Sequence, residues 1–373
     1  MSRDREVVLV GAGHAHVEVL RAWARDPEPG ARLTLVVDRE TALYSGMVPG
    51  FVAGQYRAGD LEIPVRPLAR RARARVVLGE ATRIDADARA VQVKGEASIA
   101  YDLASLDVGS TVAGKDLPGV REHAISTRPI VDLVERVQAV VRRASVGSGE
   151  LRLVIVGAGA GGVELAFCFE ARLRREVGAG CRVLLLDAGP GLLAEATPRL
   201  RARLESAARR RGIDCRCGAR VAGLDAASVQ LEDGETLPAD AVIWATGAAA
   251  HPFLGASDLP VDAGGFVRVG PTFEVEGRSD LFAVGDCASF SGAFRVPKAG
   301  VYAVRAGPVL TRNLRSRLRG TAPTAYRPQR DFLSLLNLGD GTAVGGKWGL
   351  AFEGRFVLHL KDWLDRRFVN RYV

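Results

Sequence analysis

The stretch VVLVGAGHAH at residues 7–16 decides the fold, together with a second stretch, LVIVGAGAGG, at residues 153–162. Each is a short apolar run, typical of a buried strand, followed by closely spaced glycines at the start of a predicted helix. Such a turn presents backbone N–H groups and the positive end of the helix to a pyrophosphate. Asp38 and Asp187 each end the next predicted strand, where an acid binds a ribose 2′-hydroxyl. Two such units in one chain predict two dinucleotides bound at once.

The composition is that of an ordinary soluble protein. The 373 residues leave room for two domains and a tail, and 47% of them are hydrophobic. Residues 1–6 carry both signs of charge, unlike a signal peptide, and no apolar run approaches the ~18 residues of a membrane span. Five scattered cysteines do not form a disulfide framework. We therefore expect a cytoplasmic location.

The chain is basic, with 51 basic against 43 acidic residues and a net charge of +8. The basic residues are almost all arginines, and the lysines are Lys94, Lys115, Lys298, Lys347 and Lys361. Together with abundant alanine and glycine, this pattern favours an origin in genome base composition. The alternative is attraction toward anionic lipid or phosphorylated ligands. No basic patch interleaved with aromatic residues indicates a nucleic-acid partner.

The order of the predicted elements gives the domain organisation. The first dinucleotide unit begins the chain and resumes near residue 251, so the second is inserted within it. The expected fold class is α/β, with two Rossmann-like domains and a C-terminal tail of a hairpin and a helix. The expected boundaries are 1–113 with 251–322 for the first domain, 114–250 for the second and 323–373 for the tail.

Local patterns refine this outline. Residues 76–78, 91–94 and 99–106 are predicted to be short strands of a β insertion. Residues 129–144 have helical spacing, and the glycine-rich residues 147–149 are predicted to be a flexible joint.

The most specific motif is TFEVEGRSDLFAVGD at residues 272–286. It resembles the second flavin motif of the pyridine nucleotide-disulfide oxidoreductase superfamily, in which the final aspartate binds the flavin ribityl chain. The resemblance assigns that role to Asp286; the alternative is an aspartate that caps the next helix. Ala-Thr-Gly at 245–247 matches the turn that ends the nicotinamide domain. Its flavin-domain counterpart at 107–110 is degenerate, which keeps Gly109 but weakens any role for the side chains at 107 and 108.

The resemblance covers nearly the whole chain. The likeness is to type II NADH:quinone oxidoreductases and sulfide:quinone oxidoreductases, and residues 44–50 also look like flavoproteins sometimes fused to selenide, water dikinase. It implies an enzyme that takes hydride from NADH onto flavin N5 and passes electrons to a second acceptor, with quinone leading. The implied FAD-binding residues are Gly11, Gly13, His14, Ala15, Asp38, Pro49, Gly109, Asp286 and Ala299. The implied NADH-binding residues are Gly157, Gly159, Gly162, Asp187 and Gly247.

NADPH is less favoured than NADH, because the Asp187 carboxylate repels a 2′-phosphate, and no metal site is expected. Glu164 and Lys298 are the catalytic candidates. In type II NADH dehydrogenases a glutamate matching Glu164 faces the nicotinamide and the flavin; otherwise its charge is simply favoured by a helix N-terminus. Lys298 opens a predicted helix whose N-terminus, in this family, points at the flavin. It either adds charge there, contacts a quinone, or is a solvated lysine.

The histidines and cysteines leave alternatives open. His14 lies in the first glycine turn and His16 takes its third glycine position, so that either an imidazole donates to a phosphate or the rings pack at the helix start. Residues 41–56 lack the Cys-x4-Cys pair of disulfide reductases. Sulfide:quinone enzymes require a cysteine late in the chain, and none follows Cys287 here. A sulfide:quinone-like enzyme, or another FAD-dependent reductase without a redox disulfide, remains the alternative.

The last helix, expected from about residue 353, has an apolar face interrupted by arginines. It is predicted to lie on a membrane surface, with its arginines reaching up to headgroups, or to dock on its own protein or on a partner in a homodimer. The expected face consists of Phe356, Leu360, Trp363, Leu364 and Phe368.

Overall fold

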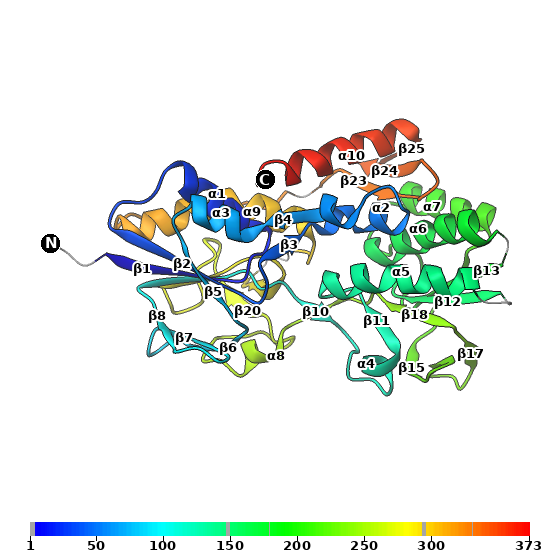
Figure 1. Cartoon of the computed structure of the whole chain (residues 1–373), viewed down its shortest axis with the longest axis horizontal. Coiled ribbons are helices and arrows are strands. Elements are labelled where there is room, and N and C mark those ends of the chain that lie inside the picture. Colours follow the sequence, from blue (N-terminus) through cyan, green and yellow to red (C-terminus); the bar gives the residue numbers. More distant parts are fainter. Residues whose placement is uncertain (1–3, 147–149, 179, 293–295, 330) are drawn as a thin grey trace.

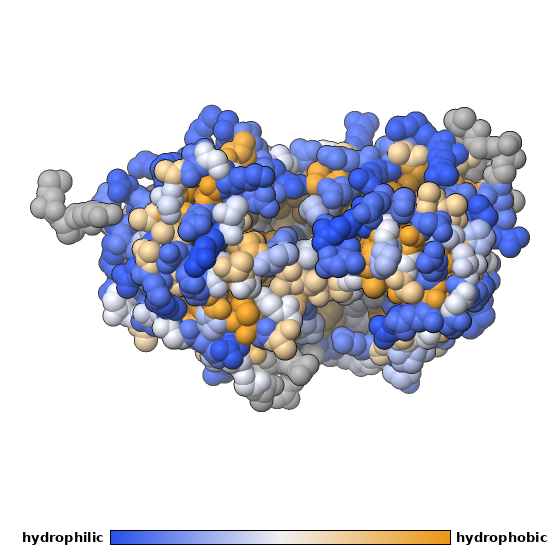
Figure 2. All heavy atoms as spheres, turned by 90° about the horizontal axis from the view of Figure 1, so that it is seen from below, coloured by the Kyte–Doolittle hydropathy of each residue, from blue (hydrophilic) through white to orange (hydrophobic). Residues whose placement is uncertain are grey.

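The computed structural model describes residues 4–146, 150–178, 180–292, 296–329 and 331–373, so the joint expected at 147–149 lies outside the described residues. Two lobes lie side by side along the long axis, and the C-terminal segment lies across them (Figure 1). Seen from below, polar residues cover both lobes and less polar residues line the hollow between them (Figure 2).

The first lobe is built on a five-stranded parallel sheet. Its strands are β1 (Arg5–Val10), β2 (Ala31–Val37), β5 (Arg75–Leu78), β9 (Leu103–Leu106) and β21 (Leu281–Ala283), in the order β21-β9-β1-β2-β5. Helices α1 (His14–Arg25), α3 (Val65–Arg71) and α9 (Gly300–Leu318) pack beside it. Because a parallel sheet is covered on both faces, its strands are continuous buried runs, as in β9.

The second lobe repeats this plan. The sheet order is β11-β18-β12-β13-β14, and all pairs are parallel. Its elements are α5 (Ile130–Val146), α6 (Ala160–Val177), α7 (Pro198–Arg211), β11 (Ala124–Ser126), β12 (Leu151–Val156), β13 (Cys181–Asp187), β14 (Asp214–Cys217) and β18 (Ala241–Trp244). The whole sheet comes between β9 and β21 of the first sheet. The expected α/β fold, with one Rossmann-like unit inserted in the other, is confirmed.

Several short elements connect and flank the two sheets. They are β3 (Thr41–Leu43), η1 (Ser45–Met47), α2 (Val48–Val52), η2 (Ala58–Leu61), β4 (Glu62–Pro64), β6 (Ala81–Asp85), β7 (Ala90–Val93), β8 (Ile99–Ala100), β10 (Thr111–Val112), α4 (Val120–His123), β15 (Val221–Leu224), β16 (Ser228–Leu231), β17 (Thr236–Pro238), β19 (Ala248–Ala249), α8 (Pro252–Gly255), β20 (Val267–Val269), η3 (Gly285–Cys287) and β22 (Ala288–Phe290).

One prediction about the strands is wrong. The runs at 76–78 and 99–106 were both expected in a β insertion, whereas β5 and β9 belong to the central sheet and only β6, β7 and β8 form the insertion. The run at 99–106 is broken after β8, and β9 then pairs with β1. The pattern misleads because a short apolar run does not reveal which sheet it joins.

The tail is a three-stranded antiparallel sheet followed by a helix. β23 (Ser334–Asn337) and β24 (Ala343–Lys347) form the expected hairpin, and β25 (Leu350–Gly354) adds a third strand. The helix α10 (Arg355–Val369) packs on these strands and lies above the two lobes in Figure 1. The expected apolar face is wrong in one residue, because Phe368 is only 5% exposed and faces inward.

No helix in the described parts of the chain is both long and apolar enough to pass through a lipid bilayer.

Candidate active site

The first glycine turn is closed around one carboxylate. Gly11 has a φ of +87°, and a Cβ there would lie 2.4 Å from the carbonyl oxygen of Asp107. A Cβ on Gly13 would lie 2.3 Å from the Asp107 carboxylate. That carboxylate accepts hydrogen bonds from the backbone N–H groups of Ala15 (2.8 Å) and His16 (3.0 Å). The side chain of Asp107 was expected to matter little; it instead caps α1 beside the predicted pyrophosphate site.

Asp107 also joins this turn to the end of β21. A Cβ on Gly285 would lie 2.6 Å from its Oδ1 atom. Burial raises the pKa of Asp107 to about 7, and the nearby charge of Asp286 acts in the same direction. The hydrogen bonds from the two backbone N–H groups lower this pKa and so oppose the rise. The glycine turn, the end of β9 and the flavin motif near Asp286 therefore meet at one point.

The two histidines of the turn have different surroundings. The Nδ1–H of His16 donates to the carbonyl of Gly11 (2.7 Å), and its Nε2 accepts from the hydroxyl of Ser105 (2.8 Å). Both ring nitrogens are therefore occupied within the protein, which favours helix-start packing for His16.

The Nε2 atom of His14 is buried and has no hydrogen-bond partner among the described residues. The centre of its ring lies 5.4 Å from that of Tyr44 and 5.6 Å from that of Phe368, and the Nε2 atom is 3.8 Å from where a Cβ on Gly300 would be. Burial lowers the pKa of His14 to about 4, although the charge of Asp286 opposes this. A neutral imidazole with an unsatisfied nitrogen beside the start of α9 fits a bound polar ligand.

The other candidate FAD ligands lie around this turn. Asp286 accepts hydrogen bonds from Nη1 of Arg128 (3.1 Å) and from the hydroxyl of Ser110 (3.3 Å). Asp38 is exposed at the end of β2, with its carboxylate bound to Arg39. Gly109 has a φ of +69° with open space around it, Pro49 is buried in α2, and Ala299 is the residue before α9. These roles stay predictions.

The second glycine turn has the same close approach but a more open mouth. A Cβ on Gly157 would lie 2.4 Å from the carbonyl oxygen of Ala245, and one on Gly162 would lie 1.8 Å from that of Gly157. Gly159 has nothing within 4 Å, so a ligand has room against its backbone. The Asp187 carboxylate accepts from the N–H groups of Ala158 and Gly189, both at 2.6 Å. Gly247 follows β18 and is also open.

The side chain of Glu164, which is 12% exposed, lies in a cluster of charges. Its Oε1 accepts a hydrogen bond from the backbone N–H of Asn337 (2.8 Å) and lies 3.9 Å from Nζ of Lys361. Lys361 donates to Asp365 (3.0 Å) and to the carbonyl of Gly46 (2.9 Å). This cluster joins α6, η1, β23 and α10.

The charged groups of this cluster change one another's pKa values. Burial raises the pKa of Glu164 to about 7, and the nearby Lys361 ammonium limits the rise. Burial opposes the charge of Lys361, but Glu164 and Asp365 together raise its pKa. Lys361 therefore stays charged through neutral pH while Glu164 exchanges a proton there.

Lys298 lies apart from this cluster. Its ammonium group donates to the carbonyl of Ala288 and sits 4.0 Å from the centre of the Phe266 ring. Burial lowers its pKa. Its catalytic role stays a prediction, and the contacts that the structure gives it are structural ones.

Comparison with known proteins assigns the family. The model of the family "pyridine nucleotide-disulphide oxidoreductase" matches residues 5–307. The chain belongs to this family. A demethylphylloquinone reductase, NdbB of Synechocystis, is 26% identical to this oxidoreductase, and the match covers all of the present chain and 92% of the relative. A type II NADH:quinone oxidoreductase, NdhA of Mycobacterium tuberculosis, is 25% identical over 95% of the chain and 82% of the relative.

Solved structures show the same fold. A sulfide:quinone oxidoreductase from Aquifex aeolicus matches the oxidoreductase with a TM-score of 0.84 at 18% identity, over 99% of this chain and 91% of that one. NDH2 of Plasmodium falciparum, in complex with NADH, matches with a TM-score of 0.83 at 14% identity, over 99% and 98% of the two chains.

The cysteines of this oxidoreductase are poor thiolate sources. Burial raises the pKa of each thiol, to about 12 for Cys287 and about 11 for Cys215. Because the thiolate is the reactive form, a mechanism through cysteine is disfavoured at neutral pH. Cys215 and Cys217 do not stand in for the Cys-x4-Cys pair of disulfide reductases, because they lie on β14, the edge strand of the second lobe.

Sequence reasoning missed Lys361 and Asp365. They are four residues apart on α10, so they share one helix face, and that face is the buried one. A lysine is rare in this arginine-rich chain, and that rarity was the available signal. The apolar residues of the same helix give the stronger sequence pattern, and that pattern does not indicate a buried lysine.

Proposed function

We propose that this oxidoreductase binds FAD at the first glycine turn and NADH at the second, and delivers electrons to a quinone. The observation that carries the proposal is the pair of glycine turns, each following a strand of its own parallel sheet, in which Gly11 and Gly157 pack too closely on a neighbouring backbone to carry a side chain. The quinone rests on the two relatives named for quinone reduction. We also propose that the chain works at the cytoplasmic face of a membrane, because of α10.

The residues of the first turn fit FAD. Gly11 and Gly13 let the turn pack tightly on Asp107, Asp286 offers a carboxylate to hydroxyl groups, and the Nε2 of His14, unpartnered among the described residues, is available to a polar atom of the ligand. When bound, FAD accepts hydride from NADH and passes two electrons to a second acceptor. Asp107 takes the hydrogen bonds of the first N–H groups of α1, so that this helix end is fixed before any ligand arrives. Ala299 and Gly300 set the start of α9 beside His14, and the positive helix end stabilises negative charge there.

Glu164 is the proposed proton donor to the quinone. Its carboxyl is buried, and with a pKa of about 7 it is half protonated at neutral pH. Lys361 sits 3.9 Å from it and keeps its own proton, so the two groups have separate tasks.

The pH dependence tests this role. In the wild type, kcat with a soluble quinone is expected to fall as the pH rises through about 7, because Glu164 then loses its proton. In Glu164→Gln that fall should disappear, and kcat at pH 6 should drop by roughly 100-fold. Ferricyanide takes electrons without protons and is the matched control. An unchanged pH profile in the variant would exclude Glu164 as the donor.

NADH preference is proposed to rest on Asp187. Its carboxylate is fixed by two backbone N–H groups at the mouth of the second turn, where a 2′-phosphate would be repelled. We expect the wild type to prefer NADH, and Asp187→Ser to narrow the ratio of kcat/KM for NADH over NADPH by about tenfold. Steady-state kinetics with both nucleotides decides. A wild type that already prefers NADPH would show this role of Asp187 to be wrong.

The outer face of α10 is the proposed membrane contact. Phe356 is 62% exposed and Trp363 is 53% exposed, with Leu360 and Leu364 between them. Arg367 and Arg371 form no ion pair among the described residues, and each adds about 1 kcal/mol of attraction to an anionic surface, whereas Arg366 is paired with Asp362.

Replacing Phe356 and Trp363 together by serine should lower co-sedimentation with phosphatidylglycerol vesicles severalfold while leaving NADH:ferricyanide activity intact. Leu78→Ser, at an exposed leucine on the edge strand β5, is the control. Salt should also weaken the binding of the wild type. If the double variant sediments like the wild type, α10 does not hold the membrane.

The proposed activity is tested by anaerobic mixing. FAD-loaded protein is first reduced with NADH, and a quinone or ferricyanide is then added as the electron acceptor. In a separate experiment sulfide replaces NADH as the electron donor. We expect NADH to remove the oxidised flavin absorbance and a quinone to restore it. Sulfide acting as the electron donor in place of NADH would instead favour a sulfide:quinone-like enzyme.

A further inference from the structure

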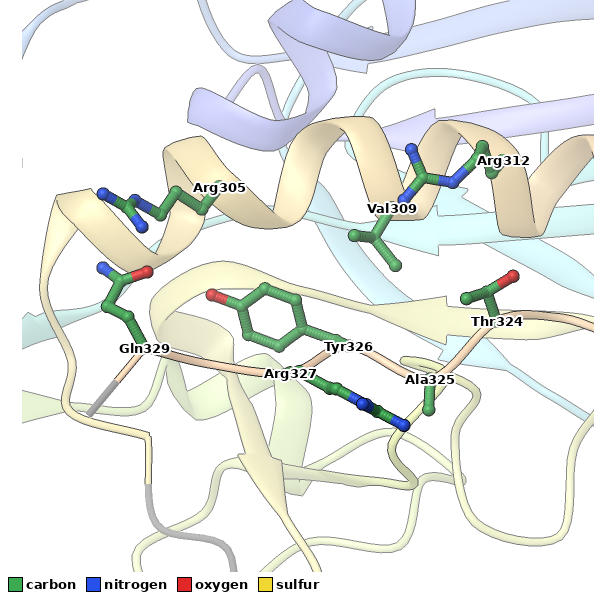
Figure 3. A pocket seen from close by; sticks show the side chains of 8 residues that line it. All are labelled: Arg305, Val309, Arg312, Thr324, Ala325, Tyr326, Arg327 and Gln329. Atoms are coloured by element: carbon green, nitrogen blue, oxygen red, sulfur yellow. The ribbon is translucent and has the colours of Figure 1, made fainter.

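The face of α9 that points away from α1 borders a groove that the oxidoreductase reaction does not use. We propose that this groove, between α9 and residues 324–329, binds a ligand that carries phosphate groups. It has a volume of about 500 Å³, within the range of small-molecule sites. Three of its lining residues are arginines and none is acidic. Figure 3 shows the groove from close by.

The helix geometry places two of the arginines together. Arg305 and Arg312 are seven residues apart on α9, so they lie on one side about 10 Å apart along the axis. Gly307 lies on the opposite side, where a Cβ would be 2.7 Å from Glu18 of α1. The two arginines therefore face away from the core of the first lobe and toward residues 324–329. This segment contributes the third arginine, Arg327.

The arginines of the groove are not paired with carboxylates. Arg305, Arg312 and Arg327 are exposed, and among the described residues none of them forms an ion pair. The next arginines along α9 and just after it do have partners. Arg315 binds Asp26, Arg317 binds Glu274 and Arg319 binds Glu28. These acids are therefore paired with arginines at the end of the helix, and none of the residues that line the groove is acidic.

The wall opposite α9 is held in place. Asn313 donates to the carbonyl of Thr324 (2.9 Å) and accepts from its N–H (2.8 Å). The N–H of Tyr326 donates to the carbonyl of Pro271 (2.8 Å). Because the backbone is anchored at two points, the groove exists before a ligand binds, which lowers the entropic cost of binding.

The groove also offers a neutral donor. The Nε2 atom of Gln329 is buried and has no hydrogen-bond partner among the described residues. Figure 3 shows Gln329 and Arg305 facing each other at one end, the Tyr326 ring in the middle below Val309, and Arg312 toward the other end. An anion between Arg305 and Gln329 would satisfy both groups.

Phosphate fits this arrangement best. The guanidinium fork matches the oxygens of a phosphate, and three such groups suit a ligand with two or more negative charges. The same chemistry is found in a free organic phosphate and in the headgroup of an anionic phospholipid.

The first arm of the test measures binding of a free ligand. FAD-loaded protein, with saturating NAD⁺ to occupy the second turn, is titrated calorimetrically with inorganic pyrophosphate. The triple variant Arg305→Gln, Arg312→Gln, Arg327→Gln is compared with Arg25→Gln, Arg142→Gln, Arg209→Gln, which removes the same charge at exposed sites outside the groove. We expect binding to weaken by about tenfold or more only in the groove variant.

The second arm uses vesicles of phosphatidylcholine with and without phosphatidylglycerol. A loss of vesicle binding in the groove variant, beyond that of the charge-matched variant, identifies a lipid headgroup as the ligand. A loss confined to pyrophosphate identifies a free phosphate. Equal behaviour of the two triple variants in both arms would overturn the proposal. Thermal melting of both variants checks that each is folded.

Discussion

Asp286→Ala is expected to release FAD from the purified protein. Asp286 is the aspartate of the flavin motif, and it lies where the glycine turn, β9 and the start of α9 converge. Loss of a charge-assisted acceptor for hydroxyl groups costs about 1.5–3 kcal/mol, so the affinity for FAD should fall roughly 10- to 150-fold. The flavin-to-protein absorbance ratio after gel filtration measures it.

The contacts of Asp286 sharpen this experiment. The carboxylate also binds Arg128, so its removal leaves a cation in the site that attracts the pyrophosphate and offsets part of the loss. Asp286→Asn keeps the shape and should bind FAD more tightly than the alanine variant. Asp116→Ala, at an exposed surface pair, should keep full flavin. Full occupancy in Asp286→Ala would contradict the assignment of the FAD site.

Lys361→Met is expected to destabilise the protein by about 3–5 kcal/mol at pH 8. The substitution leaves the buried carboxylates of Glu164 and Asp365 without the cation that both contact. Chemical denaturation in excess FAD measures the loss, and Lys94→Met, at an exposed lysine, is the control.

The pH dependence of this loss has a definite sign. Burial raises the pKa of Glu164 and of Asp365, and without Lys361 both rise further. A carboxyl whose pKa is raised by folding favours the folded state only at low pH, and that stability is lost as the pH rises through the folded-state value. The loss from Lys361→Met should therefore be small at pH 5 and grow toward pH 8. A loss that does not depend on pH would mean that packing, and not charge, is what Lys361 provides.

The parts of the fold that sequence predicts well are those with a local cause. The glycine turns can be predicted from sequence, because only glycine allows the backbone of Asp107 or Ala245 to approach so closely. The same spacing predicts two parallel sheets and their order in the chain. Strand partners follow from contacts between distant residues, and so β5 and β9 were expected in the wrong sheet.

The site was predicted least well where tertiary contacts decide the role of a residue. Asp107 looks like a departure from a motif, and only the packing of β9 against the start of α1 makes it a cap. Phe368 shares an apolar pattern with its neighbours on α10, but the docking of that helix turns it toward Tyr44 and His14. Lys361 gains its role from Glu164, which is far away in the sequence.

The central claim is that one chain holds two dinucleotides at the same time. It is tested most directly by titrating the FAD-loaded protein with NAD⁺ in a calorimeter and then measuring the flavin that remains bound. We expect one NAD⁺ per FAD-containing chain with no flavin released, and loss of the NAD⁺ site alone in Gly159→Trp, whose side chain would fill the open mouth of the second turn. NAD⁺ that displaces FAD, or a flavin-loaded protein with no NAD⁺ site, would contradict the account.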